Sequence, residues 1–439
     1  MRKQRLALEG GRPAVPQGAF GQRPAVTGLE RRKINGFLNR PDFGVGLDAS
    51  SRPSNLLARQ WADYLGVKHC LAVNSGTAAL HMCVAALDIG PGDEVIVPAL
   101  TFWASAAAVL HHNAIPVFVD IEPRTFGIDP AKIEAKISPF TKAIMPVHLH
   151  GMPAEMGNIL KLAKKHGLKV ISDACQAHGS QYRGKKIGAI EDAAGFSMEV
   201  SKPLSSGSEG GLFVTNDDLY FARAQMLRQF GEKIIPGRKR AYNAFGVGWN
   251  YRISEFGAVF GLCQLERLDA AVRKRRRCCD LISSGLKKLQ GVKPPFTPAD
   301  RDPVYFNYVV EFSPADAGVD MDPRTFRECM EKALRSEGVP MGTWQNIPVP
   351  AQAVFLKKNA YGKGCPWKCA HYRGSVSYRP EDYPETLRFL ESHSYLGPFG
   401  GKIVPETREL AERCLEGFHK VFDNLDRVLA LLNPGGKGK

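Results

Sequence analysis

The sequence predicts an α/β fold in which a mostly parallel sheet lies between layers of helices, followed by a smaller α+β region. The first observation is a series of short apolar runs, rich in Val and Ile and separated by helical stretches, at residues 94–97, 115–119, 142–147, 168–171, 194–197 and 212–214. Such runs are typical of strands buried on both faces, and their alternation with helices favours parallel pairing. The second observation is the composition, 44% apolar and 23% charged, which is that of a globular protein.

The length of 439 residues exceeds what one compact core usually holds, so more than one domain is expected. Residues 1–53, rich in Gly, Pro and Arg, are predicted to form an arm with short helices. The large α/β domain is expected over 54–270 and the smaller α+β domain over 271–439, with a long helix at 254–290 leading from one to the other. Residues 345–400, rich in Gly, Pro, Tyr and Trp, are predicted to be mainly loop.

Composition also limits the partners and the compartment. No apolar stretch follows the basic first residues and no run of about 18 apolar residues occurs, so neither an export signal nor a membrane span is predicted. The ten cysteines are then expected to be reduced thiols in the cytoplasm. The formal charge is +15, and its densest run, residues 273–277, is interpreted as a solvated helix face. Because no nucleic-acid module accompanies it, no nucleic-acid or membrane partner is predicted.

Cys365 and Cys369 flank Pro-Trp-Lys, a spacing of four that raises the question of a metal site, and His371 lies nearby. A zinc site needs more ligands than these. They are interpreted as loop thiols, with zinc binding as the alternative, and no metal is predicted.

A turn of small residues, Ser75-Gly76-Thr77, opens an Ala-rich helix. The free N–H groups and the positive dipole end of a helix can hold a phosphate, and the hydroxyls of Ser75 and Thr77 could add hydrogen bonds. The alternative is a plain helix cap. Downstream, Phe102 and Trp103 directly follow a predicted strand, so one of them could cover a flat ring; the alternative places both in the core.

Two predicted strands end at polar residues. Asp173 follows the run at 168–171, at the edge where open α/β sheets bind ligands, although a helix cap or a metal ligand is the alternative. After the run at 194–197, Lys202 lies in a loop rich in small residues. A desolvated lysine can lose its proton and form an imine with an aldehyde, whereas a surface lysine is the alternative. Taken together, an anion site, a ring cover, a carboxylate and an amine are the parts that pyridoxal phosphate requires.

The chain resembles the DegT-type sugar aminotransferases, pyridoxal-phosphate enzymes of fold type I, the aspartate aminotransferase fold. The resemblance runs from about Leu56 to Leu268 and more loosely to the end. It rests on short motifs in the family's order, which are Ser75–Thr77, Pro98–Phe102, Pro116–Asp120, Pro146–Gly151, Asp173–Gly179, Phe196-Ser197 followed by Lys202, Glu209–Gly211 and Asn250–Arg252.

The resemblance implies a role for each motif residue. Lys202 would hold the cofactor as a Schiff base, Asp173 would pair with the pyridine nitrogen, and Phe102 would stack on the ring. Gly76 and Thr77 would bind the phosphate through backbone N–H groups.

Three further residues complete this set. Ser197 would add a hydroxyl to the phosphate, and Gln176 would lie beside the ring 3-hydroxyl. Asn250 would reach the phosphate of a neighbouring subunit, which makes a homodimer with shared active sites the functional unit. A capped helix entry is the alternative for the segment around Asn250.

The implied reaction moves an amino group from glutamate or glutamine to a keto sugar or keto cyclitol, in the biosynthesis of an amino sugar, an aminocyclitol or a related natural product. Family members with His in place of the lysine act as dehydratases, so Lys202 favours transamination. A dehydratase or lyase on the same fold and a non-catalytic regulator are the alternatives. The chain departs from the family at Met198-Glu199 and at Ser208, which is inserted before Glu209.

Overall fold

In the described part of the chain, the central sheet has seven strands. The computed structural model describes residues 5–21, 24–41, 52–234, 239–397 and 404–434. In order across the sheet, the strands are β1 (His69–Val73), β9 (Gly211–Thr215), β8 (Ala193–Ser197), β5 (Lys169–Asp173), β4 (Thr141–Ile144), β2 (Glu94–Pro98) and β3 (Ile115–Val119). Within it, β9 is antiparallel to β1 and β8, and the other neighbouring pairs are parallel. The predicted mostly parallel sheet is confirmed, and β1 is an additional strand.

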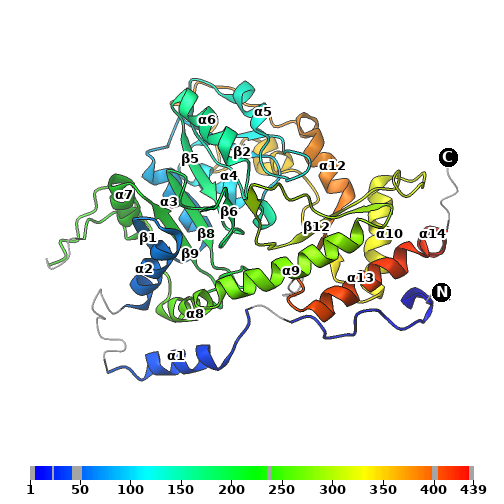
Figure 1. Cartoon of the computed structure of the whole chain (residues 1–439). Coiled ribbons are helices and arrows are strands. Elements are labelled where there is room, and N and C mark those ends of the chain that lie inside the picture. The colour runs from blue at the N-terminus through cyan, green and yellow to red at the C-terminus, as the bar shows by residue number, and fades with distance from the viewer. Residues whose placement is uncertain (1–4, 22–23, 42–51, 235–238, 398–403, 435–439) are drawn as a thin grey trace.

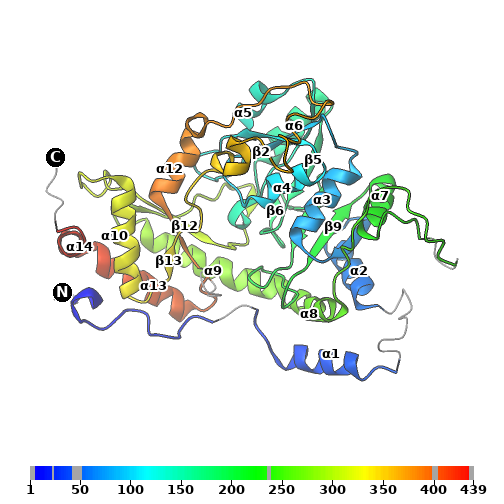
Figure 2. The same cartoon turned by 180° about the vertical axis from the view of Figure 1, so that it is seen from behind.

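Helices cover both faces of this sheet (Figures 1 and 2). Successive residues of a strand point to opposite faces, so Ile96 of β2 enters one core while Val95 and Val97 enter the other. The first core also receives α2 (Pro53–Leu65), α6 (Met156–His166) and α8 (Glu255–Leu265). The second receives α3 (Gly76–Ala86), α4 (Ala104–His111) and α7 (Asp218–Arg228). Because each face has its own apolar layer, the central residues of these strands are mostly apolar.

A smaller antiparallel sheet lies toward the C-terminal end of the sequence. Its strands, in order, are β10 (Val292–Lys293), β12 (Tyr308–Phe312), β14 (His393–Leu396) and β13 (Met341–Gly342). Its helices are α9 (Leu268–Leu286), α10 (Pro323–Ser336), α12 (Pro384–Ser392), α13 (Arg408–Phe422) and α14 (Leu425–Leu432). Helix α12 and strand β14 lie in the segment expected to be mainly loop, so that expectation is wrong for residues 384–396. Strand β14 reads His-Ser-Tyr-Leu, which lacks the apolar signal of a buried strand.

The remaining elements are short and connect or flank these layers. They are η1 (Ala7–Glu9), α1 (Gly28–Leu38), α5 (Pro130–Ile133), η2 (Glu134–Lys136), η3 (Leu149–Gly151), β6 (Gln181–Tyr182), β7 (Lys185–Lys186), β11 (Arg301–Asp302), η4 (Val349–Ala351), α11 (Ala353–Leu356) and η5 (Pro380–Asp382). The N-terminal arm runs beneath α9 and α8 in Figure 1. The domain boundaries at residues 53 and 270 stay predictions.

The helical segment after residue 254 differs from expectation in two ways. It is two helices, α8 and α9, since the backbone breaks between Leu265 and Leu268. The basic run on α9 is also not wholly a solvated face. Arg275 is only 2% exposed and donates hydrogen bonds to the Val304 carbonyl and the Glu406 carboxylate. A lone arginine in a basic run gives no sign that it is buried, because only the tertiary fold supplies its partners.

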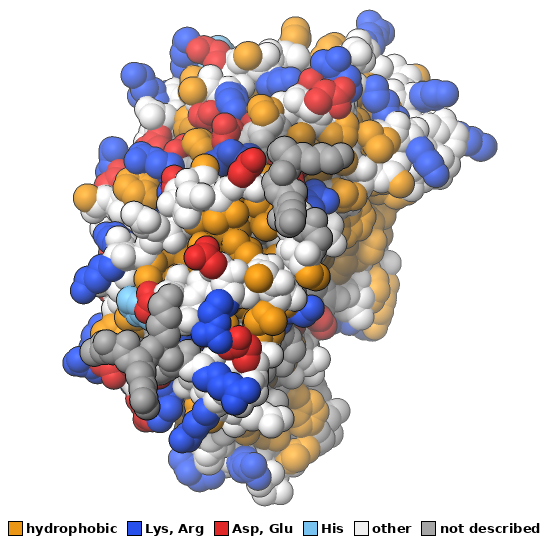
Figure 3. Space-filling model, turned by 90° about the vertical axis from the view of Figure 1, so that its right-hand side faces the viewer, with side chains coloured by type: hydrophobic (Ala, Val, Ile, Leu, Met, Phe, Trp, Pro, Cys, Tyr) orange, Lys and Arg blue, Asp and Glu red, His pale blue; other side chains and the backbone are white. Residues whose placement is uncertain are grey.

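On the face shown in Figure 3, the positively charged side chains are dispersed and do not form one basic patch. Lys and Arg side chains lie mostly around the margin of this face, with acidic side chains among them, and hydrophobic side chains gather near the middle. None of the helices in the described ranges is long and apolar enough to cross a bilayer.

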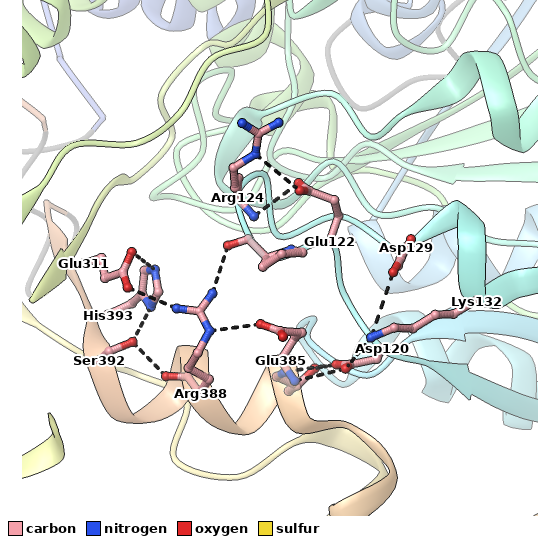
Figure 4. Close-up of polar contacts among 12 residues, drawn as sticks. Asp120, Glu122, Arg124, Asp129, Lys132, Glu311, Glu385, Arg388, Ser392 and His393 are labelled. Carbon is pink, nitrogen blue, oxygen red and sulfur yellow. Dashed lines mark hydrogen bonds and ion pairs between the residues drawn. The ribbon is translucent and has the colours of Figure 1, made fainter. Parts of the chain in front are cut away.

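Asp120 holds the start of α12 against the end of β3 (Figure 4). Its carboxylate accepts the backbone N–H groups of Glu385 at 3.0 Å and Thr386 at 2.9 Å, and also the Thr386 hydroxyl and the Lys132 ammonium. The first N–H groups of a helix lack partners within the helix, and α12 has no side-chain cap of its own. Asp120 therefore caps α12 from a distant part of the chain.

Arg388 makes the second attachment of α12. Its guanidinium bonds to Glu385 on the same helix, to Glu311 on β12 at 3.0 Å and to the Pro123 carbonyl at 3.3 Å (Figure 4). Helix α12 thus joins the end of β3 to the smaller sheet. Phe306 and Asn307, which line the cavity described below, immediately precede β12 of that sheet.

We predict that Asp120→Asn lowers the free energy of unfolding by about 1–3 kcal/mol. Both carboxylate oxygens of Asp120 accept hydrogen bonds, and the amide NH2 group that replaces one of them is a donor that cannot accept. Burial raises the pKa of Asp120, but the hydrogen bonds from Glu385, Thr386 and Lys132 outweigh burial and hold the pKa below its usual 3.8. The stabilisation is therefore fully present above the unfolded pKa and is lost as pH falls through the folded pKa.

Urea unfolding of both proteins from pH 7 to pH 3 measures this effect. The difference in the free energy of unfolding between the wild type and Asp120→Asn should be constant down to about pH 5 and shrink below pH 4. Asp320→Asn, at an exposed aspartate, is the control and should change little. A difference that grows on acidification would contradict the assignment.

Candidate active site

A cavity of about 420 Å³ lies at the carboxyl ends of the parallel strands. Open α/β sheets bind their ligands at this edge. Its lining comes from both parts of the fold and comprises Ser75, Gly76, Thr77, Leu80, Thr101, Phe102, Ala104, Val147, Asp173, Cys175, Gln176, Ser197, Glu199, Ser201, Lys202, Glu209, Phe306, Asn307 and Trp344. Every residue predicted for the site is in this set except Asn250.

One end of the cavity is the N-terminus of α3. The Ser75 hydroxyl accepts the Ala78 N–H at 3.0 Å, so the helix-cap interpretation is correct for this side chain. Gly76 packs so closely on the end of β8 that a Cβ atom there would lie 2.6 Å from the Ser197 Cβ. The glycine therefore leaves the backbone N–H groups at the helix start open to an anion, beside the Ser197 and Thr77 hydroxyls.

Asp173 is held firmly at the end of β5. It is 6% exposed, and its carboxylate accepts the Ser105 hydroxyl at 2.6 Å and the Cys175 N–H at 3.1 Å. The Thr101 hydroxyl lies 2.7 Å from that of Ser105 and can donate to it. This chain of hydroxyls orients a buried carboxylate toward the cavity, which suits a cationic partner.

Lys202 follows β8 in a tight loop. Its backbone N–H donates to the Glu199 carbonyl at 2.9 Å, and Met198 bonds to Gly210 and Ser206 on the returning chain. The Lys202 Nζ lies 4.4 Å from the centre of the Phe306 ring. The half-buried amine thus faces an aromatic wall, and the surface-lysine interpretation is wrong.

Gln176 and Asn307 are both held by His150. The Gln176 Oε1 accepts the backbone N–H of His150 at 2.6 Å, which leaves the Gln176 Nε2 to donate to a ligand. The Asn307 Nδ2 lies 3.0 Å from the His150 Nδ1. Burial lowers the pKa of His150 to about 3, so the ring is neutral. With the Asn307 Nδ2 as donor, the His150 Nδ1 is the acceptor and the ring proton is on Nε2.

Aromatic side chains close the outer side of the cavity. Phe102 is 53% exposed and Trp103 is 39% exposed, so the alternative that both are core residues is wrong. The Phe102 ring lies 6.0 Å from that of Trp344. A flat ligand ring could lie against Phe102.

Asn250 lies outside the cavity of its own chain. It is exposed, and its carbonyl accepts the Asn74 side-chain N–H at 3.3 Å. Asn250 pairs with Gln229, the residue that follows α7, and the described parts of the loop between them project beyond α7 (Figures 1 and 2). Three apolar side chains of this loop, Tyr242, Phe245 and Val247, are 68% to 78% exposed.

Several cavity residues carry no recognisable sequence signal. Phe306, Asn307 and Trp344 come from the smaller region. Their place depends on how that region docks, which short motifs do not encode. In the described residues, no group of three or more His, Cys, Asp or Glu side chains could hold a metal ion.

The cavity fits pyridoxal phosphate by the chemistry of its donors. The start of α3, opened by Gly76, suits the phosphate, and the buried carboxylate of Asp173 suits a protonated ring nitrogen. The Lys202 amine suits the aldehyde.

Known proteins agree with this fit. Residues 50–377 match the DegT/DnrJ/EryC1/StrS aminotransferase family. A putative L-glutamine:3-amino-2,3-dideoxy-scyllo-inosose aminotransferase of Streptoalloteichus tenebrarius is 36% identical over 81% of this chain and 86% of its own length. GDP-perosamine synthase of Caulobacter vibrioides is 48% identical over 231 residues, which are 53% of this chain and 61% of that protein.

A solved structure shows the same architecture. DesV of S. venezuelae, in complex with a ketimine intermediate, superimposes with a TM-score of 0.73 at 31% identity, over 89% of this chain and 93% of that one. The chain belongs to the DegT/DnrJ/EryC1/StrS aminotransferase family and is an aminotransferase of the pyridoxal-phosphate-dependent, fold type I class.

Proposed function

We propose that the protein transfers an amino group from glutamate or glutamine to a keto sugar or keto cyclitol, in the biosynthesis of an amino sugar, an aminocyclitol or a related natural product. The observation that carries the proposal is the shared cavity of Lys202, Asp173 and the N-terminus of α3. The named activities of the relatives, on a nucleotide sugar and on a cyclitol ketone, support this choice of acceptor.

When bound, pyridoxal phosphate supplies an aldehyde and an electron-withdrawing ring. Asp173 keeps a proton on the ring nitrogen, and Gln176 donates from Nε2 beside the 3-hydroxyl. The backbone N–H groups of Gly76 and Thr77, with the Ser197 hydroxyl, bind the phosphate. Phe102 covers the ring and excludes water from one face. The Lys202 Nζ moves a proton at the substrate carbon, as general base and then as general acid.

An absorbance spectrum of the purified protein separates the candidate functions. A near-visible band that glutamate or glutamine bleaches supports transamination. A band that neither donor bleaches favours a dehydratase or lyase, and a silent spectrum favours a non-catalytic regulator. The presence of both Lys202 and Asp173 in one cavity argues against the regulator.

We further propose that a homodimer with shared active sites is the functional unit, in which Asn250 reaches the neighbouring subunit's phosphate. The loop that ends at Asn250 supports this, because it exposes three apolar side chains. Exposed apolar side chains that lie together are typical of surfaces that another subunit buries. The cytoplasm is the proposed location, supported by ten free thiols.

Two inactive variants should together restore activity if the site is shared. Asn250→Ala should fold yet bind the cofactor more weakly, by about 1–3 kcal/mol, because one phosphate contact is lost. Mixing Lys202→Ala with Asn250→Asp should then yield hybrid dimers in which one site carries both changes and the other neither. Activity is measured after subunit exchange has been verified by mass. No recovery, or full activity of a monomer, would contradict the shared site.

A further inference from the structure

His81 is a fully buried histidine of α3, the helix whose N-terminus lines the active-site cavity. Both of its ring nitrogens have a partner. The Nδ1 lies 3.0 Å from the Tyr251 hydroxyl, and the Nε2 lies 3.1 Å from the His112 Nδ1. Burial, with smaller contributions from His112 and His111, lowers the pKa of His81 to about 3, so the ring is neutral. Its one N–H and its one acceptor nitrogen then serve the two partners.

The polar ring stands out from its surroundings on α3. The rest of this helix is mostly apolar, and an apolar side chain would fill the place of His81 without the cost of burying two polar nitrogens. A buried network whose members are all hydrogen-bonded fixes the place and direction of each member, which an apolar contact does not. We therefore expect the partner of His81 to need an exact position.

That partner, Tyr251, belongs to an extended segment at residues 249–252. The backbone N–H groups of Trp249 and Tyr251 donate to carbonyls in the last turn of α7, and the Asn74 N–H donates to the Tyr251 carbonyl at 2.8 Å. Successive side chains of an extended segment point to opposite sides. Trp249 and Tyr251 are half-buried, whereas Asn250 between them is exposed, as this alternation requires.

The buried side of the segment packs on His81. The rings of His81 and Trp249 meet edge to face with their centroids 4.8 Å apart, and Trp249 stacks on Tyr251 at 5.9 Å. Burial raises the pKa of Tyr251, so its hydroxyl keeps the proton at neutral pH. Because Asn250 lies between these two aromatic residues, their attachment to α3 sets the direction of the Asn250 side chain.

We propose that His81 is a positioning residue for the cofactor of the neighbouring subunit, because through the Tyr251 hydroxyl it fixes the segment from which Asn250 reaches the phosphate there. This rests on the proposed shared site. Helix α3 then serves both sites of the dimer. Its N-terminus at Gly76 binds the phosphate of its own subunit, and the His81 side chain further along the helix supports the contact to the other.

Cofactor affinity tests the inference without turnover. Full-length protein freed of its cofactor is titrated with pyridoxal 5′-phosphate, and the near-visible band that forms at Lys202 is followed. Tyr251→Phe, which removes only the hydroxyl, should raise the Kd about tenfold, as expected for the loss of one hydrogen bond. His81→Leu should raise it by a similar factor. The double variant should be no weaker than either single variant, because both remove the same interaction.

Two matched variants separate this role from a general loss of packing. His81→Asn keeps a donor and an acceptor near the position of the ring Nδ1, so it should lose less affinity than His81→Leu. His111→Asn changes an exposed histidine whose ring touches the edge of His81, and it should bind the cofactor as the wild type does. Tyr251→Phe keeps the test decisive even if His81→Leu does not fold. Unchanged affinity in Tyr251→Phe would overturn the proposal.

A hybrid dimer shows in which subunit the effect arises. Chains with Tyr251→Phe and chains with Lys202→Ala carry different affinity tags, and the hybrid is isolated through both tags. Only the Tyr251→Phe chain can form the near-visible band, and its site receives the unchanged Asn250 segment of the other chain. The band should therefore titrate with wild-type affinity. An affinity as weak as that of the Tyr251→Phe homodimer would place the effect within one chain and overturn the proposal.

Asn250→Ala in the same titration distinguishes this failure from failure of the shared site. Weaker binding by Asn250→Ala together with wild-type binding by Tyr251→Phe overturns the role of His81 alone. Wild-type binding by Asn250→Ala, or tagged chains that form no hybrid, overturns the shared site and the inference with it.

Discussion

Replacing Lys202 with Ala should lower kcat by about 10³-fold or more, because the variant loses both the covalent attachment and the proton-transfer group. The fold should survive, since the Lys202 side chain lies half-exposed at the cavity wall. Borohydride treatment of the wild type, followed by peptide mapping, locates the attachment independently of activity.

Lys185→Ala is the matched control, because Lys185 is an exposed lysine of β7 outside the cavity lining. It should retain wild-type activity. Labelling of any peptide that lacks Lys202 would refute the assignment.

Asp173→Asn should retain the cofactor but reduce kcat by roughly 10²- to 10³-fold, the range seen when one charged or polar stabiliser of a transition state is removed. An amide cannot neutralise a protonated ring nitrogen, whereas the contacts at the start of α3 are unchanged. Stopped-flow measurement of the half-reaction with the amino donor isolates this effect from acceptor binding.

Ser105→Ala serves as the companion variant. Its hydroxyl orients Asp173 without reaching the cofactor, so kcat should fall less than in Asp173→Asn. The expected decrease is about tenfold, which corresponds to one hydrogen bond to a charged group. Asp173→Asn activity within about threefold of the wild type would contradict the proposed role.

The sequence predicts six of the seven described strands of the large sheet, because each of these six carries its own signal. Strands β2, β3, β4, β5, β8 and β9 all overlap apolar runs, since burial on both faces favours apolar residues at successive positions. The site residues that end these strands, such as Asp173 and Ser197, are predictable for the same reason. Position at a strand end brings them together at one edge of the sheet.

The smaller region was harder to predict because its elements depend on partners far away in the sequence. Helix α12 is capped by Asp120 and strand β14 lies between β12 and β13, so neither is specified by its own residues. The same holds for Asn307 and Trp344, which reach the cavity only after this region has docked. Local patterns describe local preferences, and these residues depend on tertiary contacts.

The N-terminal arm has a consequence for the order in which the protein folds. The Val15 N–H bonds to the Glu337 carbonyl, and the Arg12 carbonyl accepts the Lys420 ammonium. Partners separated by 408 residues cannot meet until the segment that holds Lys420 has been synthesised. The large sheet can therefore form during synthesis, whereas the arm at residues 12–15, which is synthesised before the sheet, docks after it.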